Sequence, residues 1–280
     1  MTAAGAAALV TTHELATPAD LNAADGLDLG LYSRMKHGDL DATRALALPL
    51  ARRLLEVAPE LGTSEAPVLL PVAYMSVRPA CWFLARAVAD TIDQARADRG
   101  LPRARLIHVV KNAVTATDYA TASAAQRAAE LAAIRFQLVD DVRGAHLVVV
   151  DDVRVTGAAE RTILAPLMAG GPQSAHVAYL ATVTGVLAAD PAVEAHLNHA
   201  AVNSVTDLIP ALRRGDFALT IRFLKRLLAA TPAERAAFLS VCSPQLLDEL
   251  ADGVATSGPA LAVGFQVAIG DIDAARRVAA

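Results

Sequence analysis

The sequence is poor in the features that mark several large classes of protein. Its 280 residues include only 2 cysteines, and Cys81 and Cys242 lie far apart, without the spacing of a metal site. We therefore expect reduced thiols in the protein core. The formal net charge is −4, and Lys and Arg are spread thinly along the chain. This distribution provides no basic surface for nucleic acid or for an acidic membrane.

Uninterrupted apolar segments of membrane-spanning length are also missing. The uncharged stretch 162–189 is long enough to cross a bilayer, but the turn-forming residues GGPQS interrupt it. No Lys or Arg precedes the short apolar run near the N-terminus, which argues against a signal peptide. We expect a soluble, cytoplasmic protein. With 54% hydrophobic residues, the chain can bury one large core and a second, smaller one.

Short apolar runs alternate with amphipathic stretches through the middle of the chain. Apolar runs without polar alternation are typical of strands buried on both faces, so we predict an α/β fold with a parallel sheet covered on both sides. The predicted strands are 67–74, 104–110, 136–139, 146–150 and 174–183. The predicted helices are 38–58, 79–97, 122–134 and 158–169.

The two ends of the chain have a different pattern. Residues 1–27 show little periodicity, which is typical of a mobile segment. After about residue 190 only helical patterns remain, including 217–230 and the capping box TPAE at 231–234. We therefore divide the chain into an N-terminal segment with a helix (1–65), an α/β core (66–190) and a helical C-terminal region (191–280).

The most informative stretch is HLVVVDDVRVTG, residues 146–157. A buried strand runs into Asp151 and Asp152, two carboxylates that need a cation or hydroxyl partner when they lose water. A loop with Thr156 and Gly157 then opens a helix, whose first N–H groups form a favourable phosphate site. An acidic pair beside a phosphate site suits a ligand with both sugar hydroxyls and a phosphate.

This arrangement resembles the type I phosphoribosyltransferases, whose motif has four apolar residues, two acidic residues, a short loop, Thr-Gly and two small residues. Here it reads LVVVDDVRVTGAA, and the resemblance covers roughly residues 30–190. Together with TDYATASAAQR and LYSRMKHGD, the motif looks most like a ComF-like subgroup encoded beside tellurite-resistance and stress genes. The resemblance implies a parallel-sheet phosphoribosyltransferase core that binds 5-phosphoribosyl-1-diphosphate (PRPP) with Mg²⁺.

The resemblance also assigns roles around this motif. Asp151 and Asp152 would be the catalytic pair, holding the ribose hydroxyls directly or through Mg²⁺ and water. The 5′-phosphate would bind the loop and helix start, which comprise Val155, Thr156, Gly157, Ala158, Ala159 and Glu160. Two features depart from the family pattern. Val155 and Ala159 stand where many members have hydroxyl residues, and Glu160 adds a negative charge near the phosphate.

Three further groups complete the expected site. A diphosphate would contact Ser76, Arg78 and Lys111, which follow the first two predicted strands. The alternatives are that Arg78 is a surface arginine at a helix start and that Lys111 is a solvated lysine. Asp118, Tyr119 and Arg127 lie in a stretch that would form the flexible loop of the family. Tyr32, Arg34 and Lys36 belong either to a hood that holds the base or to a helix-capping segment.

Three functions remain open from the sequence. The first is an enzyme that transfers phosphoribose between PRPP and a nucleobase-like molecule with release of diphosphate. The second is a sensor that binds PRPP or a nucleotide without turnover, which the missing hydroxyls at Val155 and Ala159 favour. The third is a helical interaction module carried on an α/β scaffold, which leaves the acidic pair unexplained. A homodimer is also compatible with the sequence.

Overall fold

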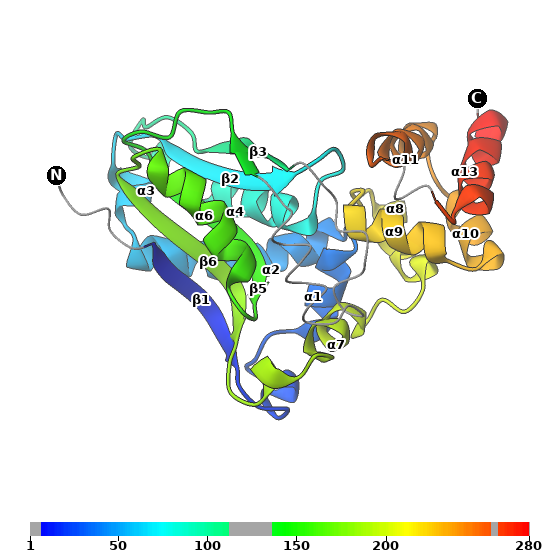
Figure 1. The fold of residues 1–280 in the computed structure, drawn as a ribbon, viewed down its shortest axis with the longest axis horizontal. Helices are drawn as coiled ribbons and strands as arrows, with labels where there is room; N and C mark the ends of the chain where they lie inside the picture. Colours follow the sequence, from blue (N-terminus) through cyan, green and yellow to red (C-terminus); the bar gives the residue numbers. More distant parts are fainter. Residues whose placement is uncertain (1–6, 112–135, 259–262, 280) are drawn as a thin grey trace.

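A six-stranded sheet forms the centre of the protein (Figure 1). The computed structural model describes residues 7–111, 136–258 and 263–279. The strand order is β1-β6-β5-β2-β3-β4, and every neighbouring pair is parallel except β3 with β4. The strands are β1 (Ala8–Leu15), β2 (Val68–Tyr74), β3 (Arg105–Lys111), β4 (Phe136–Leu138), β5 (His146–Arg154) and β6 (Ser174–Val183). The predicted α/β class is confirmed.

Helices cover both faces of this sheet, as its apolar strands require. On one face, α2 (Leu40–Val57) and α4 (Ala80–Ala97) bury Leu50, Leu54 and Leu84 against the strands. On the other face, α6 (Ala158–Ala169) packs Ile163 and Leu167 into a separate apolar cluster. Two short helices, α1 (Leu29–Lys36) and α3 (Glu60–Thr63), flank α2 in the chain. The predicted helix 122–134 lies outside the described residues.

The first strand corrects the expectation for the N-terminus. Residues 8–15 pair in parallel with β6, and Val10 and Leu15 are buried in the core. β1 lies at the edge of the sheet, so polar residues are tolerated along it and the strand lacks a continuous apolar run. The pattern of residues 1–27 therefore looked irregular, although residues 8–15 within this range form a strand of the sheet.

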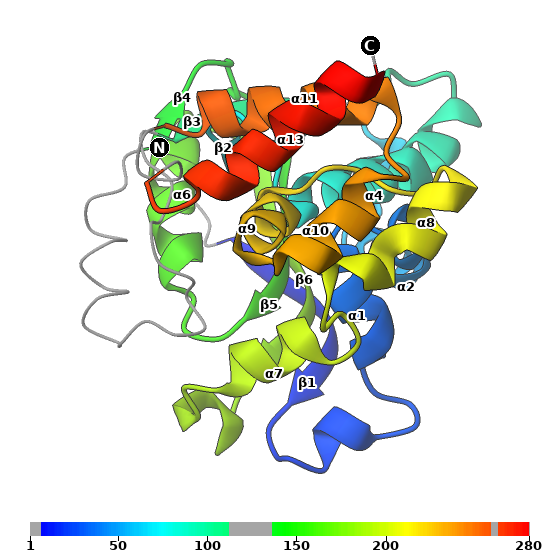
Figure 2. The ribbon, with the colours of Figure 1, turned by 90° about the vertical axis from the view of Figure 1, so that its right-hand side faces the viewer.

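The C-terminal helices form a second apolar core. We call residues 202–258 and 263–279 the C-terminal helical part (Figure 2). Its buried side chains include Phe223, Phe238 and Leu250. Thr231 and Glu234 form the predicted capping box. The helices from residue 190 onward are α7 (Val193–His199), α8 (Ile209–Arg214), α9 (Ile221–Ala229), α10 (Pro232–Leu239), α11 (Pro244–Thr256) and α13 (Gln266–Ala279). Among the described ranges, no helix is both long and apolar enough to cross a membrane.

Candidate functional site

The carboxyl ends of β2, β3, β5 and β6 lie at one edge of the sheet because these strands are parallel. Ligands of open α/β sheets bind beyond this edge. Four predicted groups follow the strands there: the loop after β2, Lys111 at the end of β3, the acidic pair on β5, and the loop before α6. The fold therefore brings most of the described candidate residues to one side of the molecule.

The acidic pair lies within β5 and not at its end. The strand continues to Arg154, because Asp151, Val153 and Arg154 keep their pairing with β6. The backbone N–H of Asp152 donates to Oδ1 of Asp151 at 2.9 Å, and the charge of Lys36 on α1 acts on Asp151 as well as on Asp152.

Asp152 is buried and already has partners from α1. The Nζ of Lys36 forms an ion pair with its Oδ2, and the hydroxyl of Tyr32 donates to the same oxygen at 3.3 Å. Its Oδ1 accepts the backbone N–H of Val153 at 2.8 Å. Burial lowers the pKa of Lys36 and raises that of Tyr32. Tyr32 and Lys36, two of the predicted hood residues, thus contact Asp152. The third, Arg34, is directed away toward Asp39, at 4.0 Å.

Asp151 lies close to the same lysine as Asp152 but has no direct ion pair with it among the described contacts. Its side chain is partly buried. Burial raises the pKa of its carboxyl to about 6, the charge of Lys36 acts to lower this pKa, and the charge of Glu194 raises it further. Because burial disfavours the ionised form of this carboxyl, a cation or hydroxyl that contacts it would stabilise the ionised form. Asp151 is therefore the member of the pair better prepared to receive a ligand.

The predicted phosphate loop has the backbone that an anion site needs. Gly157 is the N-cap of α6 and has φ of 65°, a left-handed conformation that side chains disfavour. A Cβ at this position would lie 2.8 Å from Nη2 of Arg154. The first N–H groups of a helix have no acceptor inside it, so they can bind phosphate oxygens. The loop therefore presents backbone N–H groups next to a guanidinium.

Glu160 does not act as the isolated negative charge that the sequence suggested. Its Oε2 accepts hydrogen bonds from Nε of Arg154 at 2.7 Å and from the hydroxyl of Tyr179 at 3.2 Å. These contacts offset its charge and hold the Arg154 guanidinium over the loop. Thr156 is exposed beside them, and its carbonyl accepts a hydrogen bond from Arg161 at 3.1 Å.

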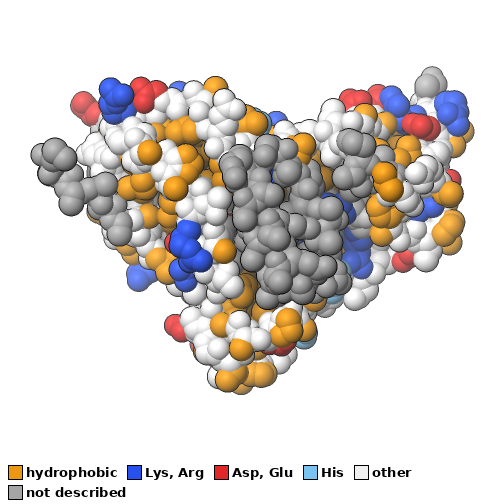
Figure 3. Space-filling model, in the orientation of Figure 1, with side chains coloured by type: hydrophobic (Ala, Val, Ile, Leu, Met, Phe, Trp, Pro, Cys, Tyr) orange, Lys and Arg blue, Asp and Glu red, His pale blue; other side chains and the backbone are white. Residues whose placement is uncertain are grey.

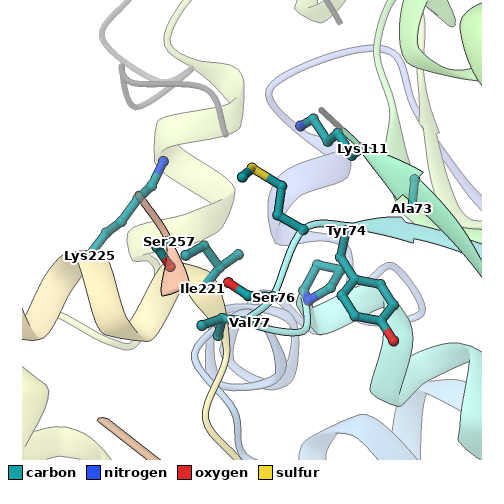
Figure 4. Close-up of a pocket in the computed structure, with 10 residues that line it drawn as sticks. Ala73, Tyr74, Ser76, Val77, Lys111, Ile221, Lys225 and Ser257 are labelled. Atoms are coloured by element: carbon teal, nitrogen blue, oxygen red, sulfur yellow. The ribbon is translucent and has the colours of Figure 1, made fainter. Parts of the chain in front are cut away.

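A pocket of about 100 Å³ lies beside the loop that follows β2 (Figure 4). Ser76 and Lys111, two of the predicted diphosphate residues, line it. Lys225 and Ser257 line it from the C-terminal helical part, and Lys111 and Lys225 extend from opposite sides (Figure 4). The third predicted residue, Arg78, is not among the lining residues; its guanidinium lies 4.1 Å from the ring centre of Trp82.

Comparison with known families decides the assignment. The profile of the PRTase ComF-like family matches residues 13–257, which is most of the chain. The protein belongs to the PRTase ComF-like family. A search of curated proteins finds no significant match.

Solved phosphoribosyltransferases are among the structures that align with part of this chain. The HGPRT-ase of Leishmania tarentolae, crystallised with GMP, is 12% identical and aligns over 52% of this chain and 68% of its own, with a TM-score of 0.32. The hypoxanthine phosphoribosyltransferase of Trypanosoma cruzi, in complex with the product IMP, is 13% identical over 52% and 68%, with a TM-score of 0.33.

Several residues at the ComF-like site were not predicted. Arg154 lies two residues after Asp152, and its opposite charge to Glu160 across the short loop could have indicated their contact. Lys225 and Ser257 come from a region that the sequence connected with no site. Asp118, Tyr119 and Arg127 lie outside the described residues, so their predicted role stays a prediction.

Proposed function

We propose that this protein binds PRPP and transfers its phosphoribosyl group to a nitrogenous base, or catalyses the reverse reaction, with release of diphosphate. The observation that carries the proposal is the β5–α6 connection: Asp151 and Asp152 on the strand, followed by Gly157 in a left-handed conformation at the helix start. The match to the PRTase ComF-like family over residues 13–257 supports it.

In this proposal the ligand lies along the carboxyl edge of the sheet. The 5′-phosphate binds the first N–H groups of α6 with Arg154 beside them. The ribose hydroxyls bind Asp151, and bind Asp152 once Lys36 has moved. The diphosphate extends toward Ser76 and Lys111. Positive charge develops on the ribose as its anomeric bond breaks, so the site needs to hold and align its ligands, and no side-chain nucleophile is required.

Mg²⁺ is the metal that this chemistry implies, and the residues present fit it. Among the described residues, no three His, Cys, Asp or Glu side chains form a metal site by themselves. Mg²⁺ usually takes one or two carboxylates together with water and substrate phosphates, so a complete protein cage is not needed. Asp151 and Asp152 are the residues that would hold it. When bound, Mg²⁺ would neutralise charge on the departing diphosphate.

A PRPP sensor without turnover is the second candidate. The Lys36–Asp152 ion pair favours it, because this contact occupies one of the two carboxylates that a ribose would use. A sensor whose hood moves when ligand displaces Lys36 would report binding without catalysis. The side chain of Val155 supplies no hydroxyl to a phosphate, which also weakens the case for a tightly organised catalytic site.

Binding and turnover separate these candidates. PRPP with Mg²⁺ should raise the melting temperature, since a ligand that binds only the folded state adds about 2.7 kcal/mol at 100 times its Kd. Diphosphate release is then measured with a panel of purine, pyrimidine and related bases. Release with any base supports the enzyme, and stabilisation without release supports the sensor. No stabilisation at millimolar PRPP contradicts both.

A further inference from the structure

The pocket beside the β2 loop is built from two parts of the molecule that have separate apolar cores. Tyr74, Ser76 and Lys111 belong to the α/β part, whereas Lys225 and Ser257 belong to the C-terminal helical part. Figure 4 shows Ser76 and Ser257 lying between the two lysines. In Figure 3, Lys and Arg side chains gather where the two parts meet. The described residues that line the pocket include two lysines and no Asp or Glu, so this lining favours an anion.

The C-terminal helical part also fixes the loop that forms the pocket. Val77 packs against the C-terminal core, and its Cγ2 lies 3.0 Å from the place where a Cβ on Gly253 would be. The backbone N–H of Ile221 donates to the carbonyl of Arg78 at 3.1 Å. These contacts hold the loop at a defined distance from α9, the helix that carries Lys225. The two walls of the pocket are therefore fixed relative to each other.

One polar atom in this pocket lacks a partner. Oγ of Ser76 is buried, and within the described part of the protein it makes no hydrogen bond. A buried hydroxyl without a partner is destabilising, so a ligand oxygen that accepts a hydrogen bond from it would be favoured. Ser257 differs, because its hydroxyl donates to the carbonyl of Gly253 at 2.6 Å.

The use of lysine in the chain points to the same place. Of the 25 cationic residues, 22 are Arg and only 3 are Lys: Lys36, Lys111 and Lys225. Lys36 pairs with Asp152, and the other two line this pocket. Lysine is a compact charge on a flexible stem, which suits the oxygens of a phosphate that must be bound and released. All three lysines thus lie at the proposed substrate side of the molecule.

We propose that Lys225 of the C-terminal helical part binds a diphosphate group in this pocket, together with Ser76 and Lys111 of the α/β part. The inference rests on the proposed function in so far as PRPP supplies the diphosphate. It assigns the C-terminal helical part a direct role in the site, because α9 supplies one of the two lysines that would bind the diphosphate.

Calorimetry with inorganic diphosphate and Mg²⁺ tests this assignment. Lys225→Gln should lower diphosphate affinity about tenfold, the usual effect of losing one charged hydrogen bond. Lys225→Arg keeps the charge and should recover part of the affinity. Arg277→Gln is the matched control, because it removes one positive charge from an exposed position of the same part, on α13. Unfolding midpoints of all variants check that each is folded.

Ribose 5-phosphate separates failure of this inference from failure of the proposed function. It lacks a diphosphate, so Lys225→Gln should bind it as the wild type does. If Lys225→Gln binds diphosphate as tightly as Arg277→Gln, or if the wild type does not bind diphosphate, the assignment of Lys225 is wrong. If the wild type binds neither ribose 5-phosphate nor PRPP but binds diphosphate through Lys225, the proposed function fails and the assignment stands.

Discussion

Asp151 and Asp152 are adjacent in sequence, yet their substitutions should have opposite effects on stability. Asp151 has its pKa raised from 3.8 to about 6 by burial. Between these pH values the folded protein binds more protons than the unfolded chain, so the free energy of unfolding decreases as pH rises through this interval. Above pH 6 the whole destabilisation caused by the buried, ionised carboxylate is present.

Asp151→Asn should therefore stabilise the ligand-free protein by up to about 3 kcal/mol at pH 7.5, since the pKa is raised by about 2 units and each unit corresponds to about 1.4 kcal/mol. The gain should shrink as pH falls through 6 and vanish below the pKa of an unfolded aspartate. Urea denaturation at pH 7.5 and pH 4.0 measures it. A gain of equal size at both pH values would mean that ionisation of Asp151 is not its cause.

Asp152→Asn should instead destabilise the protein. The side chains of Lys36 and Asp152 are only 15% and 11% exposed, so the substitution leaves a buried ammonium without its carboxylate, at a cost of about 3 kcal/mol. The double variant Lys36→Met/Asp152→Asn removes the unpaired charge and should recover most of the loss. Urea denaturation of the wild type, both single variants and the double variant gives the coupling energy. A coupling near zero would show that the ion pair is not formed.

Gly157→Ala tests the phosphate loop, and Gly171→Ala provides its control. Both glycines have a positive φ, 65° and 72°, so each substitution should cost about 1 kcal/mol of stability. A Cβ at 171 has nothing within 4 Å, whereas one at 157 displaces the Arg154 guanidinium. Only Gly157→Ala should weaken ribose 5-phosphate binding, by at least several-fold in calorimetry. Equal affinities of the two variants for ribose 5-phosphate would mean that this loop does not bind the phosphate.

At the level of single residues, the sequence indicated the motif but not its contacts. Asp151, Asp152 and Gly157 were identifiable because strand, acidic pair and loop occur in one order. The partner of Asp152 could not be found, because Lys36 lies on a different element, more than a hundred positions away. Nothing in local spacing reports such a pairing.

Among the described strands and helices, β1 is a strand that the sequence pattern did not predict. The buried strands β5 and β6 read as continuous apolar runs and were predicted. The edge strand β1 carries Thr11, Thr12, His13 and Glu14 between its apolar ends, so no strand pattern stands out. Its place beside β6 depends on pairing with residues far away in the chain.

Leu15→Ala should reveal how much β1 contributes to the core. Leu15 is 1% exposed, so its truncation should cost about 2 to 5 kcal/mol of unfolding free energy. Leu9→Ala is the matched control on the same strand, because Leu9 is 47% exposed and its change should fall within about 0.5 kcal/mol. Urea denaturation compares the two. Equal small effects would mean that β1 is only loosely attached to the sheet.

Across the whole molecule, the proposed contacts couple two apolar cores through one ligand. Ribose 5-phosphate reaches only the α/β part, so it should slow amide hydrogen exchange in β5 and the first turn of α6. PRPP with Mg²⁺ should also slow exchange in α9 and α11, because its diphosphate contacts Lys225 near both helices. Exchange measured by mass spectrometry distinguishes the two patterns. Protection of α9 and α11 by ribose 5-phosphate alone would contradict the separation of the two subsites.

The order of strands also dictates how the protein can assemble during its synthesis. β1 is made first but pairs only with β6, and His176 follows its partner Ala8 by 168 positions. At translation rates of about 5–20 residues per second, β1 waits roughly 8 to 34 s for that partner. An unpaired strand invites pairing with other chains, and charged or polar side chains reduce that tendency. The threonines, histidine and glutamate of β1 also made this strand hard to predict from the sequence. We expect the same polar side chains to reduce pairing of β1 with other chains until β6 has been synthesised.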